Sequence, residues 1–344
     1  QNNAWAVDGA MTDVKGDRSK SPSQQADPDL FLHVVERTPD GVYVTGAKAH
    51  QTGYLNSHYV LVMPTISMRP GDEDYAVSFA CPTDAEGITL ILGRQSCDTR
   101  KTEQHNDIDV GNKVYGGHEV LVIFDRVFIP NDMIFLNGEV QFAGMMVERF
   151  AGYHRQSYGG CKVGVGDVLI GATALAGDMA GSAKASHLKD KRIEMTHLNE
   201  TLYCCGIAGS SQGSKTKSGN YLLDLLLANV CKQNVTRFPY EIARLAQDLA
   251  GGIMVTQPSE ADYRNPATHD YIEKYLKGVD SVPTEDRMRV LRLIENMTMG
   301  TAAVGYLPES MHGAGSPQAQ RIMISRQSNL EMKKQLAKDI ARIK

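Results

Sequence analysis

The hydrophobic pattern of the 344-residue chain changes near Gly138. Between residues 30 and 138, short runs rich in β-branched side chains alternate with Pro, Gly and Asp turns, which is typical of a small barrel or sandwich. We expect strands at residues 31–36, 41–46, 58–63, 75–80, 88–92 and 119–130. Residues 1–29 are polar and rich in turn residues, and we expect them to form a loop that could face an anionic ligand.

From residue 139 to 344, apolar residues recur at helical spacing instead. Residues 220–231 are apolar nearly all round, which predicts an interior helix, whereas the Lys- and Gln-rich C-terminal segment predicts a solvated amphipathic one. A variable loop is expected near 263–282. We expect helices at roughly 141–182, 184–208, 219–250, 284–303 and 317–343. The predicted fold class is therefore α+β, with a β-domain followed by a helical bundle.

Composition narrows the functional classes. The net charge is -4, the pI is about 6.2 and there is no basic block, which argues against nucleic acid or an anionic membrane as partner. No apolar run reaches membrane-spanning length, and Gln1 is not followed by a signal-peptide pattern. The cysteines lack the density of a disulfide scaffold, which favours a reducing, cytoplasmic setting. They are Cys81, Cys97, Cys161, Cys204, Cys205 and Cys231. Because the chain lacks an initiator Met and opens in a polar stretch, we expect a fragment or one half of a split protein.

Residues 148–166 concentrate groups that can do chemistry. The stretch contains His154, Tyr158, Cys161 and Lys162. On a helix, the first three stand at i, i+4 and i+7 and share one face. His154 and Cys161 would lie about 10 Å apart along the axis, too far to bind one ion but workable for two irons of one cluster. The glycine pair at 159–160 permits close backbone approach. The alternative is a packing helix with a satisfied histidine and an inert cysteine, because the spacing matches no standard zinc site.

Four other positions are candidates. Residues 47–53 join two predicted strands and form either a surface turn at Gly53 or a loop that places His50, Gln51 and Thr52 against a ring system. Glu119 opens a strand, where a glutamate is usually solvated. Glu309 lies in a Gly-rich link before a new helix at Pro317, and this link can also be an ordinary C-cap. The pair Gly251–Gly252 closes a helix, and its second glycine suggests a close approach by something outside the helix.

The stretch around His154 and Cys161 resembles the cluster-binding helix of the 4-hydroxybutyryl-CoA dehydratase family. These flavin and iron–sulfur enzymes are related to 4-hydroxyphenylacetate 3-monooxygenases and share the acyl-CoA dehydrogenase fold. The resemblance runs from Asp13 to the C-terminal helix. It implies FAD and a [4Fe-4S] cluster, with His154 and Cys161 as ligands. The N-terminal helical domain of the family is absent from this chain, so two further cysteines are expected from a missing segment or a companion chain.

The resemblance also implies site residues and an assembly. The catalytic residues it implies are Thr52, Glu119, His154, Tyr158, Lys162 and Glu309. The FAD- and CoA-facing residues it implies are Met11, Thr12, Asp13, Lys15, Gly16, Asp17, Arg18, His50, Gln51, Thr52, Gly251, Gly252 and Ala314. Because the double glycine would hold FAD of a neighbouring subunit, a homotetramer built as a dimer of dimers is expected.

The implied reaction converts 4-hydroxybutyryl-CoA to crotonyl-CoA by a redox-neutral radical mechanism, with vinylacetyl-CoA isomerisation at the same site. His154 would take the β-proton, Tyr158 and Lys162 would assist the departing hydroxyl or the thioester, and Glu119 and Glu309 remain unranked for the other proton transfers. One alternative is a flavin-dependent aromatic monooxygenase, whose relatives lack the two cluster ligands. The other is a non-catalytic structural subunit, which would have no physical need of these side chains.

Overall fold

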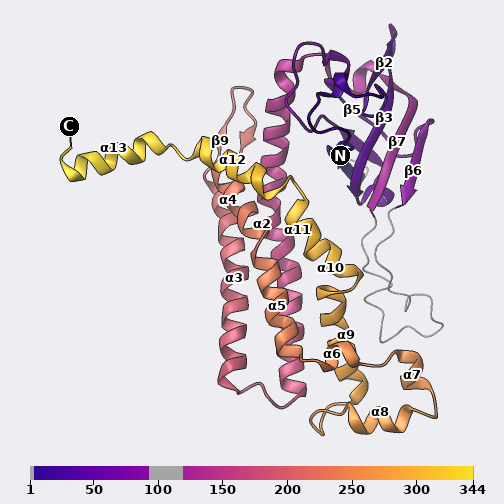
Figure 1. The fold of residues 1–344 in the computed structure, drawn as a ribbon, viewed down its shortest axis with the longest axis vertical. Helices are drawn as coiled ribbons and strands as arrows, with labels where there is room; N and C mark the ends of the chain where they lie inside the picture. Colours follow the sequence, from indigo (N-terminus) through magenta and orange to yellow (C-terminus); the bar gives the residue numbers. More distant parts are fainter. Residues whose placement is uncertain (1–3, 93–118, 344) are drawn as a thin grey trace. The chain divides into compact units, whose positions relative to one another are not determined.

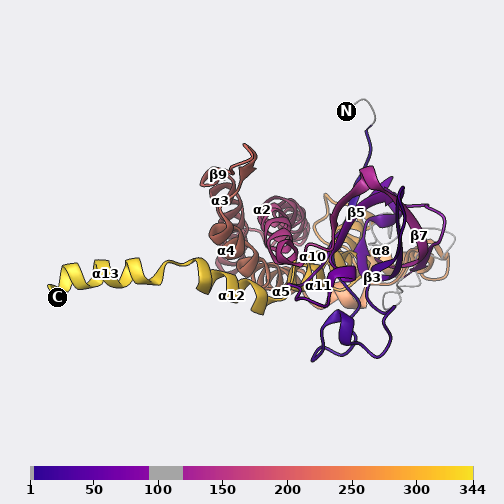
Figure 2. The same cartoon turned by 90° about the horizontal axis from the view of Figure 1, so that it is seen from above.

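The computed structural model describes residues 4–92 and 119–343 of the chain. The described residues form two compact units, one from residues 4–92 with 119–150 and the other from residues 151–343. Figure 1 and Figure 2 show the first unit in indigo and magenta and the second in pink, orange and yellow. Each unit is described by itself.

The first unit contains two four-stranded sheets (Figure 1). The first sheet has the order β1 (Val7–Ala10), β4 (Tyr59–Val62), β5 (Val77–Pro82) and β8 (Ile134–Asn137). The second has the order β2 (His33–Arg37), β3 (Gly41–Thr52), β7 (Glu119–Pro130) and β6 (Ile88–Leu92). Strand β1 pairs with β4 in parallel, and the other pairs are antiparallel.

Alternating apolar side chains from both sheets form one core. Val44 of β3 and Val122 of β7 are each 0% exposed, while their neighbours along the strands are half-buried, and Phe79 of β5 joins them in the core at 0% exposure. This period of two is what a sheet with one buried face requires. The sequence pattern therefore identified the central strands correctly, with ends that shift slightly for β2, β4 and β5.

Three sequence expectations for this unit were wrong. The segment expected to be a loop up to residue 29 contains β1, and β8 was not predicted. Both strands have only four residues, too short to show a period of two, and tertiary pairing defines them. Residues 47–52 are not a surface turn but the end of β3, which continues past an irregularity between Lys48 and Gln51. The turn begins at Gly53, whose φ of 84° favours glycine.

The second unit is mainly helical. Helix α2 (Val140–Met179) begins in the first unit and continues through the second. It is followed by α3 (Ser186–Ser211), the short strands β9 (Ser214–Lys215) and β10 (Tyr221–Leu222), α4 (Leu225–Val235), α5 (Phe238–Ala250), α6 (Ile253–Thr256), α7 (Glu260–Arg264), α8 (His269–Tyr275), α9 (Thr284–Thr298), α10 (Thr301–Tyr306), α11 (Pro308–His312), α12 (Pro317–Gln327) and α13 (Leu330–Ala341). Helix α3 lies beside α4 and α5 (Figure 1 and Figure 2).

Small residues bring α2 and α3 unusually close together. A Cβ added to Gly159 would lie 2.6 Å from the Cα of Gly206, so neither glycine leaves room for a side chain. The close approach expected from the glycine pair is thus made by its first member. A Cβ on Gly160 would have no neighbour within 4 Å. A second core joins α2, α3, α5 and α9, and includes Leu169, Met195 and Ile242 at 0% exposure.

The helix boundaries correct several expectations. The segment predicted as one helix over 219–250 instead contains β10, the second strand of a β-hairpin, followed by α4 and α5. The two helices are separate because Pro239 lies in the first turn of α5. The helices predicted over 284–303 and 317–343 each break into two, the latter at Asn329, which caps α13. The expected loop over 263–282 contains all of α8 and the end of α7. The solvated character of the last helix is confirmed, because α13 has no buried residue.

Helix α2 also corrects the expectation about membrane-spanning length. Among the described residues, α2 is a helix that is long enough and apolar enough to cross a membrane, judged by length and composition alone. A core helix of a globular protein meets the same criteria. Helix α2 contributes Leu169 to a protein core and carries the buried charged residues Arg155 and Lys162.

Candidate active site

Helix α2 runs unbroken through the stretch from 148 to 166, as predicted. The His154 ring stacks on the ring of Tyr158, with centroids 5.2 Å apart and planes 14° from parallel. This contact confirms that the i and i+4 side chains share one face. His154 is half-buried, Tyr158 is 1% exposed and Cys161 is exposed.

The phenol of Tyr158 lies between polar groups from three other positions. Its hydroxyl donates to Oε1 of Glu309 at 3.3 Å. The Nζ atoms of Lys162 and Lys232 each lie 5.0 Å from its ring centroid. An ammonium at this distance from an aromatic ring is attracted by the negative face of the ring. The phenol is therefore fixed by a hydrogen bond from its hydroxyl to Glu309 and by the two lysines near its ring.

Glu309 and Lys162 form an ion pair in this cluster. Lys162 is 4% exposed, and its Nζ donates to Oε2 of Glu309 at 2.8 Å and to the carbonyl of Gly305 at 2.6 Å. Three residues singled out in the sequence, Tyr158, Lys162 and Glu309, are thus brought together from α2 and α11. The Gly-rich link proposed around Glu309 is a short helix, and α12 begins at Pro317 as expected.

The turn after α11 packs against α2 through its backbone. Ala314 has φ of 55°, a left-handed conformation that is uncommon without glycine. Its carbonyl accepts a hydrogen bond from Nε of Arg155 at 2.9 Å, and Arg155 also donates to Oδ1 of Asn229 at 2.8 Å. A Cβ on Gly313 would lie 2.0 Å from the Tyr158 hydroxyl. Ala314 is therefore used for packing in this structure, and its predicted cofactor contact remains a prediction.

Burial and charge both act on the imidazole. Desolvation lowers the pKa of His154 below its usual 6.5, the cations Lys232, Lys162 and Arg155 lower it further, and Glu309 opposes them. His154 is therefore neutral near pH 7, the state in which an imidazole can accept a proton or bind a metal. Lys232, which the sequence analysis missed, is 0% exposed, and desolvation lowers its pKa to about 7.

His154 and Cys161, the two predicted cluster ligands, do not by themselves form a metal site in the described residues. Desolvation by neighbouring atoms raises the pKa of Cys161, although the residue is exposed and the Lys162 charge favours the thiolate. The described parts of the chain contain no group of three or more His, Cys, Asp and Glu side chains able to hold a metal ion. A [4Fe-4S] cluster takes four protein ligands, so His154 and Cys161 fit at most half of its needs.

The other cysteines differ in their surroundings. Cys81 and Cys231 are 2% and 0% exposed. Cys204 is exposed on α3, and Cys205 is half-buried. Cys97 lies outside the described residues, as do the residues 116–118 before Glu119.

A second polar group lies in the first unit. Thr52 and Glu119 face each other across β3 and β7, and the threonine hydroxyl lies 2.8 and 2.7 Å from the two carboxylate oxygens. Burial raises the pKa of Asp8 to about 6, with the Glu119 charge adding to the rise and a Gly9 backbone hydrogen bond opposing it. Oδ2 of Asp8 is buried without a hydrogen-bond partner in the described structure. The sequence analysis missed Asp8, because a lone aspartate in an expected loop carries no signal.

The predicted cofactor-facing loop is partly occupied by internal contacts. Asp13 forms a buried ion pair with Lys48, whose Nζ also donates to the carbonyls of Met11 and Met63. Thr12 is half-buried. The remaining members are exposed, and they are Lys15, Gly16, Asp17 and Arg18. Asp13 and Met11 therefore make internal contacts in this unit, whereas the exposed residues 15–18 are accessible to a ligand.

The predicted flavin-facing residues at the end of β3 diverge. His50 is exposed with φ of 58°. Gln51 is 3% exposed, and its side-chain nitrogen donates to the carbonyl of Ala49 at 2.7 Å. The side chain of Gln51 thus points into the protein, and the exposed backbone and side chain near His50 and Thr52 are the parts left to meet a ligand.

The double glycine after α5 is exposed. Gly251 has φ of 72° and ends the helix, which explains that glycine by conformation alone. Gly252 has φ of -61°, which any residue adopts. A Cβ on either residue would meet no atom within 4 Å. Nothing within this unit therefore requires a glycine at 252.

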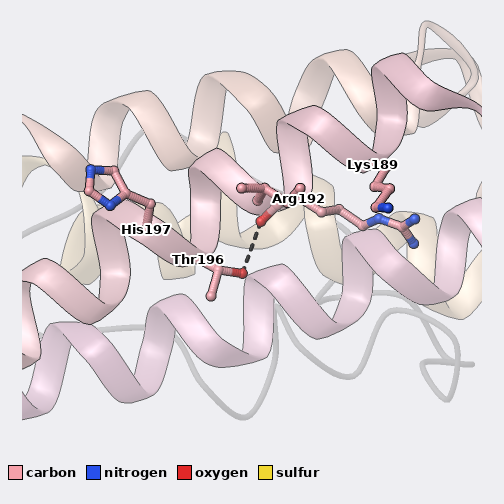
Figure 3. A pocket seen from close by; sticks show the side chains of 5 residues that line it. Lys189, Arg192, Thr196 and His197 are labelled. Carbon is pink, nitrogen blue, oxygen red and sulfur yellow. Dashed lines mark hydrogen bonds between the residues drawn. The ribbon is translucent and has the colours of Figure 1, made fainter.

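An open depression on α3 lies outside this chemistry. It has a volume of about 500 Å³ and is lined by Lys189, Arg192, Ile193, Thr196 and His197. Figure 3 shows these side chains along one helix, with the Thr196 hydroxyl donating to the Arg192 carbonyl at 2.9 Å. Because a single helix lines it and it contains no carboxylate, it provides no enclosed site.

Comparison with known proteins decides the family. Two family models match the chain, described as the 4-hydroxyphenylacetate 3-hydroxylase N-terminal part, over residues 1–136, and C-terminal part, over residues 143–342. The 4-hydroxybutyryl-CoA dehydratase/vinylacetyl-CoA-Δ-isomerase of Clostridium aminobutyricum is 66% identical over 100% of this chain and 72% of its own length. The chain belongs to the 4-hydroxybutyryl-CoA dehydratase branch of the 4-hydroxyphenylacetate 3-hydroxylase family.

Solved structures agree with this family assignment. An oxygen-tolerant archaeal 4-hydroxybutyryl-CoA dehydratase from N. maritimus is 61% identical, with a TM-score of 0.96, over 99% of this chain and 68% of that one. The oxygenase component of 4-hydroxyphenylacetate 3-monooxygenase complexed with FAD shares the fold at 22% identity, with a TM-score of 0.85, over 98% of this chain and 69% of that one. Glutaryl-coenzyme A dehydrogenase shares the fold more distantly, at 12% identity and a TM-score of 0.54, over 98% of this chain and 66% of that one. The predicted combination of strands and helices is confirmed, and the chain shares the fold of these monooxygenase and acyl-CoA dehydrogenase structures.

Proposed function

We propose that this chain dehydrates 4-hydroxybutyryl-CoA to crotonyl-CoA and isomerises vinylacetyl-CoA, as part of an assembly that also contains a helical N-terminal segment. The observation that carries the proposal is the Tyr158–Glu309–Lys162 group, with the His154 ring stacked on the phenol. The relative with the same activity in its name supports it at 66% identity.

The chain's own residues divide the proton chemistry in this proposal. A neutral His154 accepts a proton at its imidazole, because its pKa is lowered by burial and by three cations. Lys162 binds Oε2 of Glu309 and leaves Oε1 to the phenol. The Tyr158 hydroxyl is thereby held in one place, and in this proposal it turns its single proton from Glu309 to a departing hydroxyl group or a thioester oxygen.

Glu119 and Thr52 form the second proposed group. The threonine hydroxyl donates to the carboxylate and fixes its orientation. The proposal gives Glu119 one of the remaining proton transfers. A Glu119→Gln variant should lose most of the dehydration rate while its unfolding temperature changes little, because Glu119 lies at the start of β7 and is only half-buried.

Two cofactors complete the proposal. FAD would supply reversible one-electron oxidation when bound, and the exposed His50, Thr52 and residues 15–18 would contact it. A [4Fe-4S] cluster would supply a Lewis-acidic iron, with His154 and Cys161 as two of its ligands and two thiolates from outside the described residues. A companion chain or segment would carry those thiolates.

The metal part is tested by matched cysteine variants. Iron, acid-labile sulfide, flavin and dehydration rate are measured on the anaerobically purified complex, with a mass spectrum of every chain in it. Cys161→Ser should lose iron and dehydration together. Cys204→Ser, at an exposed cysteine on α3, should keep both. Full iron content and full rate in Cys161→Ser would refute the ligand assignment.

The flavin part is tested at the double glycine. We propose that Gly252 contacts FAD bound by a neighbouring subunit of a homotetramer. Since a Cβ on Gly252 meets nothing in its own unit and its φ is ordinary, Gly252→Ala should fold normally. It should nevertheless lose bound FAD. An unchanged flavin content and an unchanged affinity for added FAD would remove this contact from the proposal.

The alternative function is aromatic hydroxylation. A 4-hydroxyphenylacetate 3-monooxygenase oxygenase component of Thermus thermophilus is 24% identical over 84% of this chain and 59% of its own length. Turnover of 4-hydroxyphenylacetate with reduced flavin and oxygen, without turnover of 4-hydroxybutyryl-CoA, would replace the dehydratase proposal with this one. Turnover of neither substrate by an iron- and flavin-replete complex would favour a structural subunit.

A further inference from the structure

Lys232 occupies a place where a charged side chain is costly. It lies on α4 and is 0% exposed, and desolvation is the main cause that lowers its pKa to about 7. Its Nζ forms no salt bridge in the described part of the structure. The nearby carboxylate of Glu309 is instead paired with Lys162. An apolar side chain of similar length would bury the same volume without this cost.

The Lys232 amine contacts two other helices. Nζ donates to the carbonyl of Ser310 on α11 and lies 5.0 Å from the ring centroid of Tyr158 on α2. Ser310 is itself 0% exposed and directly follows Glu309 in sequence. Lys232 thus links the backbone next to Glu309 with the ring of Tyr158. The hydroxyl of that ring donates a hydrogen bond to Glu309.

We propose that Lys232 is a positioning residue that sets the distance between α11 and the Tyr158 ring, and so aims the Glu309 carboxylate at the Tyr158 hydroxyl and at Lys162. The inference rests on the proposed function only for its kinetic readout. Its structural readout, the mobility of α11, is independent of activity.

The variants separate the hydrogen bond from the packing. Lys232→Met keeps most of the volume and removes the donor, whereas Lys232→Gln keeps a neutral donor. Ile242→Val is the matched control, since Ile242 is 0% exposed on α5 and lies in a different core cluster. It loosens the same unit without touching the polar groups around Tyr158.

The kinetic test compares kcat with KM. Lys232→Met should lower kcat by about 100-fold, the size expected when catalytic groups shift by about 1 Å. KM should change by no more than about twofold, because the groups displaced act in the transition state. Lys232→Gln should recover part of kcat, and Ile242→Val should retain it. In a Tyr158→Phe background, Lys232→Met should cost much less, because the hydroxyl to be aimed is already gone.

Hydrogen–deuterium exchange provides the independent readout. Amides of α11, residues 309–312, should exchange faster in Lys232→Met than in the wild type, while those of α5 should not. If Lys232→Met fails to fold, Lys232→Gln alone is compared with Ile242→Val in both assays. Unchanged exchange in α11 together with unchanged kcat would overturn the inference. Absence of dehydration in the wild type would instead refute the proposed function and leave the exchange result to decide this one.

Discussion

Gly313 occupies a position where the phenol of Tyr158 leaves no room for a side chain. An added Cβ would lie 2.0 Å from the Tyr158 hydroxyl, 3.2 Å from Cζ and 2.8 Å from the carbonyl of Glu309. The φ of Gly313 is -59°, so Gly313→Ala introduces no backbone strain. The substitution is therefore a steric wedge between the turn after α11 and the Tyr158 ring.

The magnitude follows from what must move. The phenol is rigid and 1% exposed, so the turn, the ring or both must shift by roughly 1 Å to reach an ordinary contact distance. Overpacking of this kind costs about 1–3 kcal/mol of folding free energy. The same shift would lengthen the hydrogen bond from Tyr158 to Glu309, which is already 3.3 Å. A displacement of this size should lower the dehydration kcat by about 100-fold.

A double-mutant cycle with Tyr158→Phe tests the reasoning. Removing the hydroxyl deletes the atom at 2.0 Å and leaves the contacts at 2.8 and 3.2 Å. Gly313→Ala should therefore cost about 1 kcal/mol less in the Tyr158→Phe background than in the wild type. Denaturant unfolding of all four proteins measures this coupling. Gly305→Ala is the matched control, because its Cβ would meet only Oε2 of Glu309 at an ordinary 3.7 Å. A zero coupling energy would refute the packing argument.

Two further predictions address the two units separately. Burial raises the pKa of Asp8 from 3.8 to about 6, so its contribution to folding is fully present below pH 3.8 and is lost as the pH rises through 6. Asp8→Asn should thus be more stable than the wild type at pH 7, by about 2 kcal/mol, and should lose this advantage at pH 4, as thermal unfolding at both pH values would show. Gly159→Ala should destabilise the α2–α3 crossing by about 1–3 kcal/mol, since its Cβ would meet the Gly206 Cα at 2.6 Å. Gly160→Ala, with open space around it, should be neutral or stabilising by up to about 1 kcal/mol in the same denaturant titration.

The sequence predicted best the features that repeat along an element. The long strands β3 and β7 and the long helices α2 and α3 have many residues over which a period shows. Strand β1 has only four residues and depends on its pairing with β4. The break before α5 depends on one proline. A pattern averaged over a window hides such local events. This is why the prediction of one helix over 219–250 missed the strand β10 and the break between α4 and α5.

The candidate site shows the same division. His154, Tyr158, Cys161 and Lys162 were found because one helical stretch contains them all. Their partner Glu309 was found by resemblance, since 147 positions separate it from Lys162 and no local pattern links the two. Asp8 was missed because β1 pairs with β4 in one sheet while Glu119 lies in the other, and one sequence does not reveal how the two sheets pack.

Lys232 was missed although the sequence contained a usable signal. Ala228, Cys231, Lys232 and Val235 stand at i, i+3, i+4 and i+7, the spacing of a buried helical stripe, and each is 0% exposed. Three members are small or apolar, so the lysine interrupts an otherwise consistent pattern. A long apolar stretch led us to predict an interior helix and to overlook the one charged member of its buried face. Burial of an amine costs free energy unless the amine is hydrogen-bonded or paired, so a lysine inside such a stripe is itself a candidate for a functional contact.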